Sequence, residues 1–150
     1  MKKIVLASAL ALAAVSASAL EVGVTATRDY SGADNRNFGG VTIGQSYGKL
    51  NATAGIERSS VGNNDQNRFS LVGGYDVAKI GVVTVTPRLG VAYLNNQVGE
   101  NGYAMTVGVG ATVPVTKQVS VGLAVDRQYG QDRVQQFDGN RVTAGVKYAF

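Results

Sequence analysis

The sequence predicts an all-β chain: an eight-stranded antiparallel up-and-down transmembrane β-barrel, preceded by a cleavable signal peptide. Three observations lead to this prediction. The N-terminus has a basic segment, followed by an apolar segment and then by small residues. The remaining chain alternates apolar residues with small, polar or charged ones. Polar, turn-forming segments interrupt that alternation at regular intervals, and long segments alternate with short ones.

Residues 1–19 have the layout of a secretory signal peptide: two lysines, an apolar stretch over residues 4–15, and small residues up to Ala19. We expect cleavage between Ala19 and Leu20, which leaves residues 20–150 as a single barrel domain. An anchoring helix is the alternative, but the apolar stretch is shorter than the roughly 20 residues that a spanning helix needs. No later segment has the ~18 consecutive apolar residues of a membrane helix, so the mature chain can cross a bilayer only as a barrel.

The period-two alternation is clearest over residues 103–113, 119–126 and 141–150. One face of these segments carries Val, Leu, Met, Tyr and Phe, whereas the other carries Gly, Ser, Thr, Ala and charged residues. A soluble sandwich or lipocalin-like barrel also alternates, but it needs bulky side chains inside to form its core. Here the face with bulky apolar side chains lies opposite a face of small and charged residues, which would make a poor core if the apolar face were inside. The pattern therefore favours a barrel whose apolar face meets lipid.

Seven connections define eight strands. The four long ones are expected at residues 31–37, 59–66, 95–101 and 128–138, and the three short ones at 49–51, 77–81 and 114–117. Long loops at one end, short turns at the other and both termini at the short-turn end are typical of outer-membrane barrels.

The aromatic residues are expected to form two girdles, one at each membrane interface. Those assigned to the long-loop end are Tyr30, Phe38, Phe69, Tyr93, Tyr103, Tyr129 and Phe137. Those assigned to the short-turn end are Tyr47, Tyr75, Tyr148 and Phe150.

The C-terminal strand resembles the terminal strand of bacterial outer-membrane proteins, since it alternates apolar residues and ends in Phe; its determinants are Val142, Ala144, Val146, Tyr148 and Phe150. With the signal peptide and the strand count, the mature chain resembles the small OmpA- and OmpX-like barrel family. The resemblance implies a location in the bacterial cell outer membrane, surrounded by its lipid and lipopolysaccharide. It also implies recognition by the barrel-assembly machinery, with periplasmic chaperones during biogenesis. Members of that family have several functions, so the resemblance does not choose among them.

Composition narrows the possible chemistry. Because the chain has no histidine, it cannot supply the general base of lipid A-modifying enzymes or outer-membrane proteases. Without cysteine or histidine the usual transition-metal sites are also excluded, and we expect neither catalysis nor a cofactor. A calcium site among Asp29, Asp34 and Asp65 is conceivable, but these acids are interpreted as solvated loop residues. No basic run indicates a nucleic-acid partner, and we expect a monomer.

The most informative residues are charged ones that the alternation places inside the barrel: Glu21, Glu57, Arg68, Asp76, Arg88, Asp126, Arg141 and Lys147. Ionised groups in so narrow a space must pair or stay hydrated. Symmetric hairpins place Glu57 beside Arg68 and Asp126 beside Arg141, with Arg88 joining Glu57. Glu21 and Lys147 lie on the strands that close the barrel.

These residues support two interpretations of the lumen. In the first, the charges brace and plug it, and the protein has a structural or surface-interaction role in the envelope. In the second, they gate a narrow porin-like pathway for small ions or solutes. Adhesion or ligand binding through the loops is a third possibility, although loops of this length with few aromatic residues are poor protein-binding surfaces.

Overall fold

The computed structural model describes residues 19–31, 34–61, 64–96, 101–131, 134 and 137–150. The described residues form nine strands. They are β1 (Ala19–Ser31), β2 (Asp34–Tyr47), β3 (Leu50–Val61), β4 (Asn64–Tyr75), β5 (Ala78–Ile80), β6 (Val83–Asn96), β7 (Gly102–Pro114), β8 (Val119–Gly130) and β9 (Gly139–Ala149). Eight of them are long, and β5 has only three residues.

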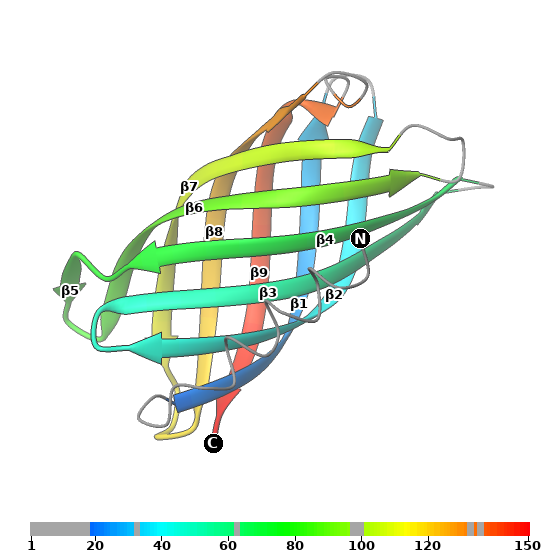
Figure 1. Ribbon diagram of the computed structural model, residues 1–150. Coiled ribbons are helices and arrows are strands. Elements are labelled where there is room, and N and C mark those ends of the chain that lie inside the picture. Colours follow the sequence, from blue (N-terminus) through cyan, green and yellow to red (C-terminus); the bar gives the residue numbers. More distant parts are fainter. Residues whose placement is uncertain (1–18, 32–33, 62–63, 97–100, 132–133, 135–136) are drawn as a thin grey trace.

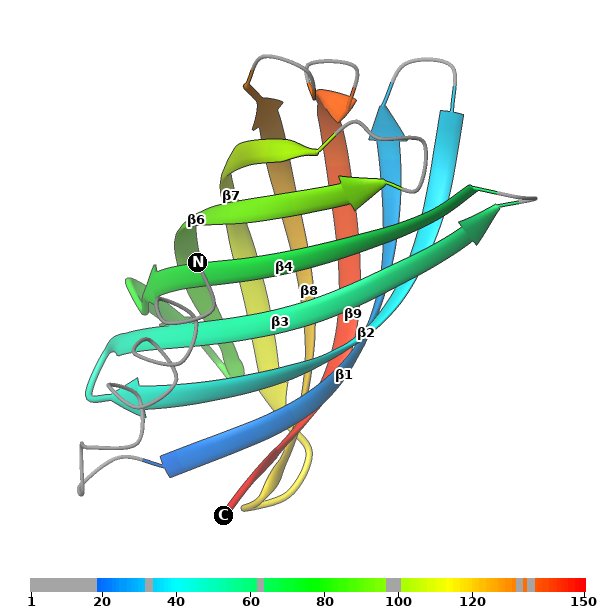
Figure 2. The ribbon, with the colours of Figure 1, turned by 45° about the vertical axis from the view of Figure 1, so that its right-hand side comes forward.

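The eight long strands form a closed antiparallel barrel, as the sequence predicts (Figures 1 and 2). Neighbouring strands in the chain pair with each other, β1 pairs with β9, and β4 pairs with β6. The short strand β5 is an addition that the sequence analysis missed. It pairs only with the start of β6, at the short-turn end. Closure leaves no unpaired edge among the long strands, which a wall surrounded by lipid requires.

The strands are strongly staggered. A row of paired residues that starts at Tyr30 on β1 and is followed through β9 and the other long strands returns to β1 at Leu20, ten residues nearer the strand start. Such a stagger tilts the strands steeply against the barrel axis. Residues that lie at one level of the barrel therefore belong to different rows, which decides the contacts inside.

Tight turns close the end of the barrel where the chain terminates. Gly48 begins the two-residue turn between β2 and β3, and Gly81 begins the turn between β5 and β6. Their φ angles are 60° and 62°, in the left-handed region where a side chain is strained. The first turn is thus one residue earlier than the predicted connection at 49–51.

All four long-loop connections begin later than expected, and the first two also end earlier. The predicted loop at 31–37 is mostly strand, because β1 runs to Ser31 and β2 begins at Asp34. Likewise, β3 runs to Val61 and β4 begins at Asn64. Polar residues such as Asn35 and Asn37 are exposed on these strand ends. There the hydrogen-bonded ladder continues past the apolar band into water, where outward side chains need not be apolar.

The two faces of the wall differ as the alternation predicts. Outward Val, Leu and Ile side chains are exposed along the strands, whereas the polar residues between them are half-buried or buried. Two aromatic residues depart from the predicted girdles. Phe38 is buried inside the barrel, and Phe137 packs against a buried cluster at the loop end. Phe137 lies in the connection predicted at 128–138, and Phe38 directly follows the one predicted at 31–37, where the alternation does not extend to fix its facing.

Of the predicted signal peptide, residues 1–19, all but Ala19 lie outside the described residues, and β1 begins at Ala19. Within the described residues, no helix has the length and apolarity needed to cross a membrane.

The two faces make a testable prediction. Leu123 is 61 % exposed on the outer face of β8, between Val121 and Val125. Replacing Leu123 with Arg should lower the free energy of unfolding by about 2 to 4 kcal/mol, because it places a charge in the lipid. Thr106→Ser, on the inner face, should change it little. Urea unfolding of the barrel in lipid vesicles measures both, and a larger loss for Thr106→Ser would reverse the assignment of the faces.

Candidate functional site

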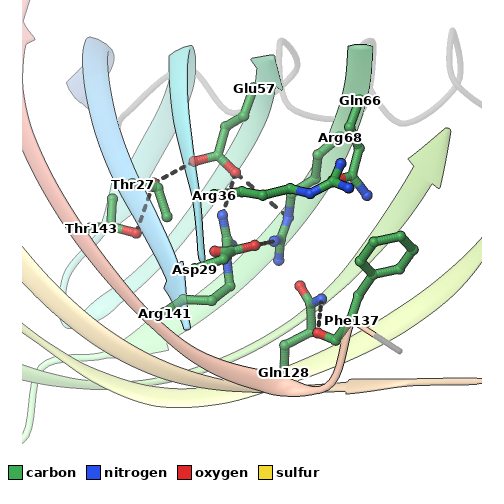
Figure 3. Close-up of polar contacts among 10 residues, drawn as sticks. All are labelled: Thr27, Asp29, Arg36, Glu57, Gln66, Arg68, Gln128, Phe137, Arg141 and Thr143. Carbon is green, nitrogen blue, oxygen red and sulfur yellow. Dashed lines mark hydrogen bonds and ion pairs between the residues drawn. The ribbon is translucent and has the colours of Figure 1, made fainter. Parts of the chain in front are cut away.

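The loop half of the lumen holds a buried cluster of two acids and two arginines from four strands (Figure 3). Arg141 donates from Nη2 to Glu57 Oε2 at 2.8 Å and from Nε to Asp29 Oδ1. The Nε of Arg68 lies 3.5 Å from Glu57 Oε2, and its Nη1 lies 3.9 Å from Asp29 Oδ2. Thr27 donates to the second oxygen of Glu57 at 2.6 Å. Each carboxylate therefore contacts both guanidinium groups.

A glycine allows Glu57 to reach the far side of this cluster. Glu57 on β3 is paired with Gly40 on β2, and Gly40 is paired with Thr25 on β1. A Cβ atom at position 40 would lie 2.7 Å from Cγ of Glu57 and 2.5 Å from the carbonyl oxygen of Ile56. The glutamate thus leans across the bare backbone of β2 toward β1 and β9.

A second pair repeats this arrangement. Arg88 on β6 and Asp126 on β8 are both paired with Gly108 on the strand between them. Nε of Arg88 lies 3.5 Å from Oδ1 of Asp126. A Cβ atom at position 108 would overlap that oxygen. The two charges therefore meet over a residue that has no side chain.

The short-turn half of the lumen carries more open polar contacts. Lys147 donates to Glu21 Oε2 at 3.3 Å, and Ser46 donates to the other oxygen of Glu21 at 3.2 Å. Asp76 accepts hydrogen bonds at its Oδ1 from Thr86 at 2.6 Å and from Asn51 at 3.2 Å. Glu21, Asp76, Arg88 and Lys147 line a cavity of about 320 Å³ together with several threonines and serines.

Among the four basic residues predicted in the lumen, the exposed fraction of the side chain rises from the loop end to the turn end. Arg68 is 1 % exposed, Arg141 6 %, Arg88 26 % and Lys147 37 %. The bulkiest fully buried side chains all come from the loop half; they are Arg68, Leu94, Gln66, Gln128, Val134 and Ser59. The lumen is therefore filled on the loop side and hydrated on the turn side.

An apolar cluster completes the filling near the loops. Leu94, Ala104 and Val134 are buried together, and Phe137 packs against them. A Cβ atom on Gly102 would lie 2.9 Å from Val134, so this valine covers the start of β7. Gln128 donates to the carbonyl oxygen of Phe137 at 2.8 Å and holds the β8–β9 connection over the lumen (Figure 3).

The structure places all eight predicted lumen charges on the inner face, but it pairs some of them differently. Glu57 lies beside Arg68, and Glu21 beside Lys147, as the sequence predicts. The expectation that Arg88 joins Glu57 is wrong. Arg68 is paired with Leu94 on β6, whereas Arg88 lies six residues earlier on that strand and contacts Asp126. Arg141 is paired in register with Asp126, yet it turns to Asp29 and Glu57.

Sequence analysis missed two inner residues. Asp29 had been assigned to a solvated loop, but it lies an even number of residues from Glu21 on β1 and is buried. Arg36 is buried on β2, with Nη1 3.4 Å from Gln66 Oε1 and its guanidinium group over the Phe137 ring. An even spacing from residues already known to face inward on the same strand is the signal that identifies such residues.

The possible calcium site is not supported by the described residues. Asp29 points into the barrel, whereas Asp65 forms an ion pair with Arg58, which is 63 % exposed on the outer face. The side chain of Asp34 lies outside the described residues. Across the described part of the chain, no group of three acidic residues is arranged to hold a metal ion.

Comparison with known proteins identifies the fold. No family model matches the chain, and no curated protein matches its sequence. Among solved structures, Neisserial surface protein A matches with a TM-score of 0.65 at 15 % identity, over 89 % of this chain and 97 % of that one. The chain has the fold of the small outer-membrane barrels. The similarity that the sequence analysis stated is therefore confirmed at the level of architecture.

Two further structures support this conclusion. A major outer membrane protein of Thermus thermophilus matches with a TM-score of 0.62 at 15 % identity, covering 87 % of this chain and 99 % of its own. The outer membrane protein Ail of Yersinia pestis matches with a TM-score of 0.57 at 9 % identity, covering 89 % and 99 %. Identities this low establish a shared architecture and leave the role of the lumen to its own residues.

The burial gradient predicts unequal costs for the same substitution at two positions. Glu57→Gln should lower the free energy of unfolding by about 3 to 5 kcal/mol, because it leaves two buried guanidinium groups short of a carboxylate. Glu21→Gln removes a carboxylate from a hydrated pair and should cost about 1 kcal/mol or less. Urea unfolding in lipid vesicles compares the two variants. Equal costs would contradict a buried, bracing role for Glu57.

Proposed function

We propose that this protein is an integral outer-membrane barrel with a structural role in the envelope, and that its lumen is plugged and does not conduct. The observation that carries the proposal is the filled loop half of the lumen, where the Glu57, Arg68 and Arg141 cluster lies beneath buried glutamine and apolar side chains. A rigid, closed interior suits a protein whose working surface is its outer wall.

The fold also supports an orientation. In barrels of this type the termini and short turns face the periplasm and the longer connections face outward. Here β1 begins and β9 ends beside the short turns, at the lower end of Figure 1. The plugged half then lies toward the cell exterior, and the hydrated cavity lies toward the periplasm.

Surface interaction through the loops is less well supported. One structural neighbour is described as a surface protein and another as an attachment invasion locus protein. In this chain, however, only two residues separate β1 from β2 and two separate β3 from β4. The longer connections at this end are confined to residues 97–101 and 131–138. Connections of these lengths offer little area for a protein partner, since stable interfaces bury about 800 Å² on each side.

The plugged lumen predicts that the protein is silent in planar-bilayer recordings. The double variant Phe38→Ala with Leu94→Ala should widen the loop half, because both side chains are buried there. Heat-modifiable migration in gels checks that this variant is folded before it is recorded. It serves as the opened control, in which leakage through the barrel becomes measurable. Steady conductance of the parent, equal to that of the opened variant, would contradict the plug.

The narrow pore remains the second candidate because the polar cavity already occupies the turn half of the lumen. Under that hypothesis, the buried cluster is a gate, and Glu57→Gln loosens it by releasing Arg68 and Arg141. Conductance that appears in Glu57→Gln and is absent from the parent would favour this function. Loss of stability without conductance favours the structural one.

The C-terminal end of the last strand supports recognition by the assembly machinery. Phe150 is 74 % exposed, packs edge-on against Tyr148 at 5.1 Å between ring centroids, and donates its backbone N–H to Leu20 at 3.0 Å. The ring therefore contributes little to the packed barrel and remains accessible at the rim. The residues Val142, Ala144 and Val146 are exposed on the outer face along the same strand.

Deletion of Phe150 should therefore slow assembly in cells much more than it destabilises the folded barrel. Heat-modifiable migration of newly made protein in membranes follows assembly, and urea unfolding of refolded protein measures stability. Phe150→Tyr is the matched control that keeps the aromatic terminus. Normal assembly of the deletion variant would exclude this role.

A further inference from the structure

The outer wall carries a repeated pattern that the lumen does not explain. Three of the four strands that ascend from the short turns to the loops present four outward apolar residues followed by an outward arginine. The outward residues run Leu20, Val22, Val24, Ala26, Arg28 on β1; Leu50, Ala52, Ala54, Ile56, Arg58 on β3; and Val119, Val121, Leu123, Val125, Arg127 on β8. All three arginines are exposed.

Each of these arginines has an asparagine as its paired residue on the descending strand of the same hairpin. The pairs are Arg28 with Asn37, Arg58 with Asn67, and Arg127 with Asn140. In the fourth hairpin, β6–β7, the pair Tyr93 and Tyr103 occupies the corresponding place, with ring centroids 5.2 Å apart. We call the three Arg–Asn pairs the arginine arc.

The stagger of the barrel brings the arginine arc to one level. Arg58 shares a row with Ala26, two residues before Arg28, and Arg127 shares a row with Tyr30, two residues after it. A stagger of ten residues over eight strands displaces a row by slightly more than one residue per strand. A row followed over two strands therefore changes its level along the barrel axis by slightly more than two residues. This change compensates for the two-residue differences, so Arg28, Arg58 and Arg127 lie at nearly the same level. The arc lies directly above the apolar band, at the loop end.

The chemistry of the arc fits phosphate. A guanidinium group binds phosphate in a bidentate fork, and an adjacent asparagine amide adds a neutral donor. Tyr30 and Tyr129 lie under the guanidinium groups of Arg28 and Arg127, at 5.4 and 5.7 Å from the ring centroids, and hold them against the wall. Arg58 shares its charge with Asp65, so Arg28 and Arg127 are the stronger members.

The opposite rim has a different chemistry. The exposed lysines of the described residues, Lys49, Lys79 and Lys117, all lie in or beside the short turns. The described part of the chain therefore places its outward arginines at one membrane interface and its exposed lysines at the other. A general need for positive charge at a membrane surface does not explain this separation, because either side chain would meet it.

We propose that the arginine arc binds the phosphate groups of a phosphorylated glycolipid in the outer leaflet, with Arg28 and Arg127 as the principal contacts. The two residues are two strands apart, about 10 Å at the usual strand spacing. A disaccharide headgroup with a phosphate at each end spans such a gap across β9. This inference rests on the proposed outer-membrane location and adds a specific lipid partner to it.

The experiment uses the barrel in phosphatidylcholine nanodiscs that contain diphosphoryl lipid A or the same lipid without phosphates. The readout is the midpoint temperature at which the heat-modifiable folded band is lost, together with the amount of lipid A retained in native mass spectrometry. Diphosphoryl lipid A should raise the midpoint of the parent, more at low than at high salt. The dephosphorylated lipid should not raise it.

Three variants locate the contact. Arg28→Gln with Arg58→Gln and Arg127→Gln should lose the shift and retain lipid A at least about tenfold more weakly, since hydrogen bonds to charged groups contribute that much. The matching triple change to Lys should recover only part of the shift. Lys49→Gln with Lys79→Gln and Lys117→Gln removes the same charge from the opposite rim and should bind like the parent.

Several results would overturn the assignment. They are an equal shift in the arginine-to-Gln variant, an equal loss in the lysine-to-Gln control, and equal stabilisation by dephosphorylated lipid. Protection of the parent by soluble sucrose octasulfate in plain phosphatidylcholine, as strong as that by lipid A, would indicate a general polyanion surface instead. A protein that never inserts into the nanodisc would contradict the proposed location itself, a failure visible before any lipid A is added.

Discussion

Closure of the hydrogen-bonded ladder is the constraint on which the rest of this structure depends. A sheet whose outer face is apolar cannot leave edge backbone groups unpaired there, so the first strand, β1, must pair with the last, β9. Closure forces every long strand to present one face outward and one to a narrow lumen. The apolar outer face, the polar inner face and the charges that must find partners inside all follow from it.

Glycine makes the crowded lumen possible. Charged side chains in a narrow barrel cannot all point to the centre, and here they lie along the wall, across neighbouring strands. Gly40 leaves room for Glu57, and Gly108 leaves room for the contact between Arg88 and Asp126. Glycine weakens an ordinary strand, but here its missing side chain leaves the space in which a charged pair lies against the wall. Each such pair depends on three strands, two of which supply the charges while the third supplies the space.

The sequence alone predicts much of the fold, because the alternation depends on a two-residue period that no tertiary detail changes. Strand number, closure and the facing of the eight charges follow from it, as does the contact of Glu57 with Arg68 within one hairpin. Contacts across the lumen do not follow, since they depend on the stagger, which no local turn signal encodes. Asp29, Arg36 and Phe38 were missed for a related reason. Their polar neighbours resemble a loop, although the ladder continues through them.

The connectivity of the central cluster links it to the order of folding. Arg141 contacts Asp29 and Glu57, which are 112 and 84 residues away in the chain. Hairpins can form locally, but these contacts exist only after the first strand has met the last. A two-residue register slip at that final seam would place Arg141 opposite Thr27 or Ser31 in place of Asp29. The buried cluster therefore favours the correct register at closure, because only the correctly registered barrel pairs the buried charges.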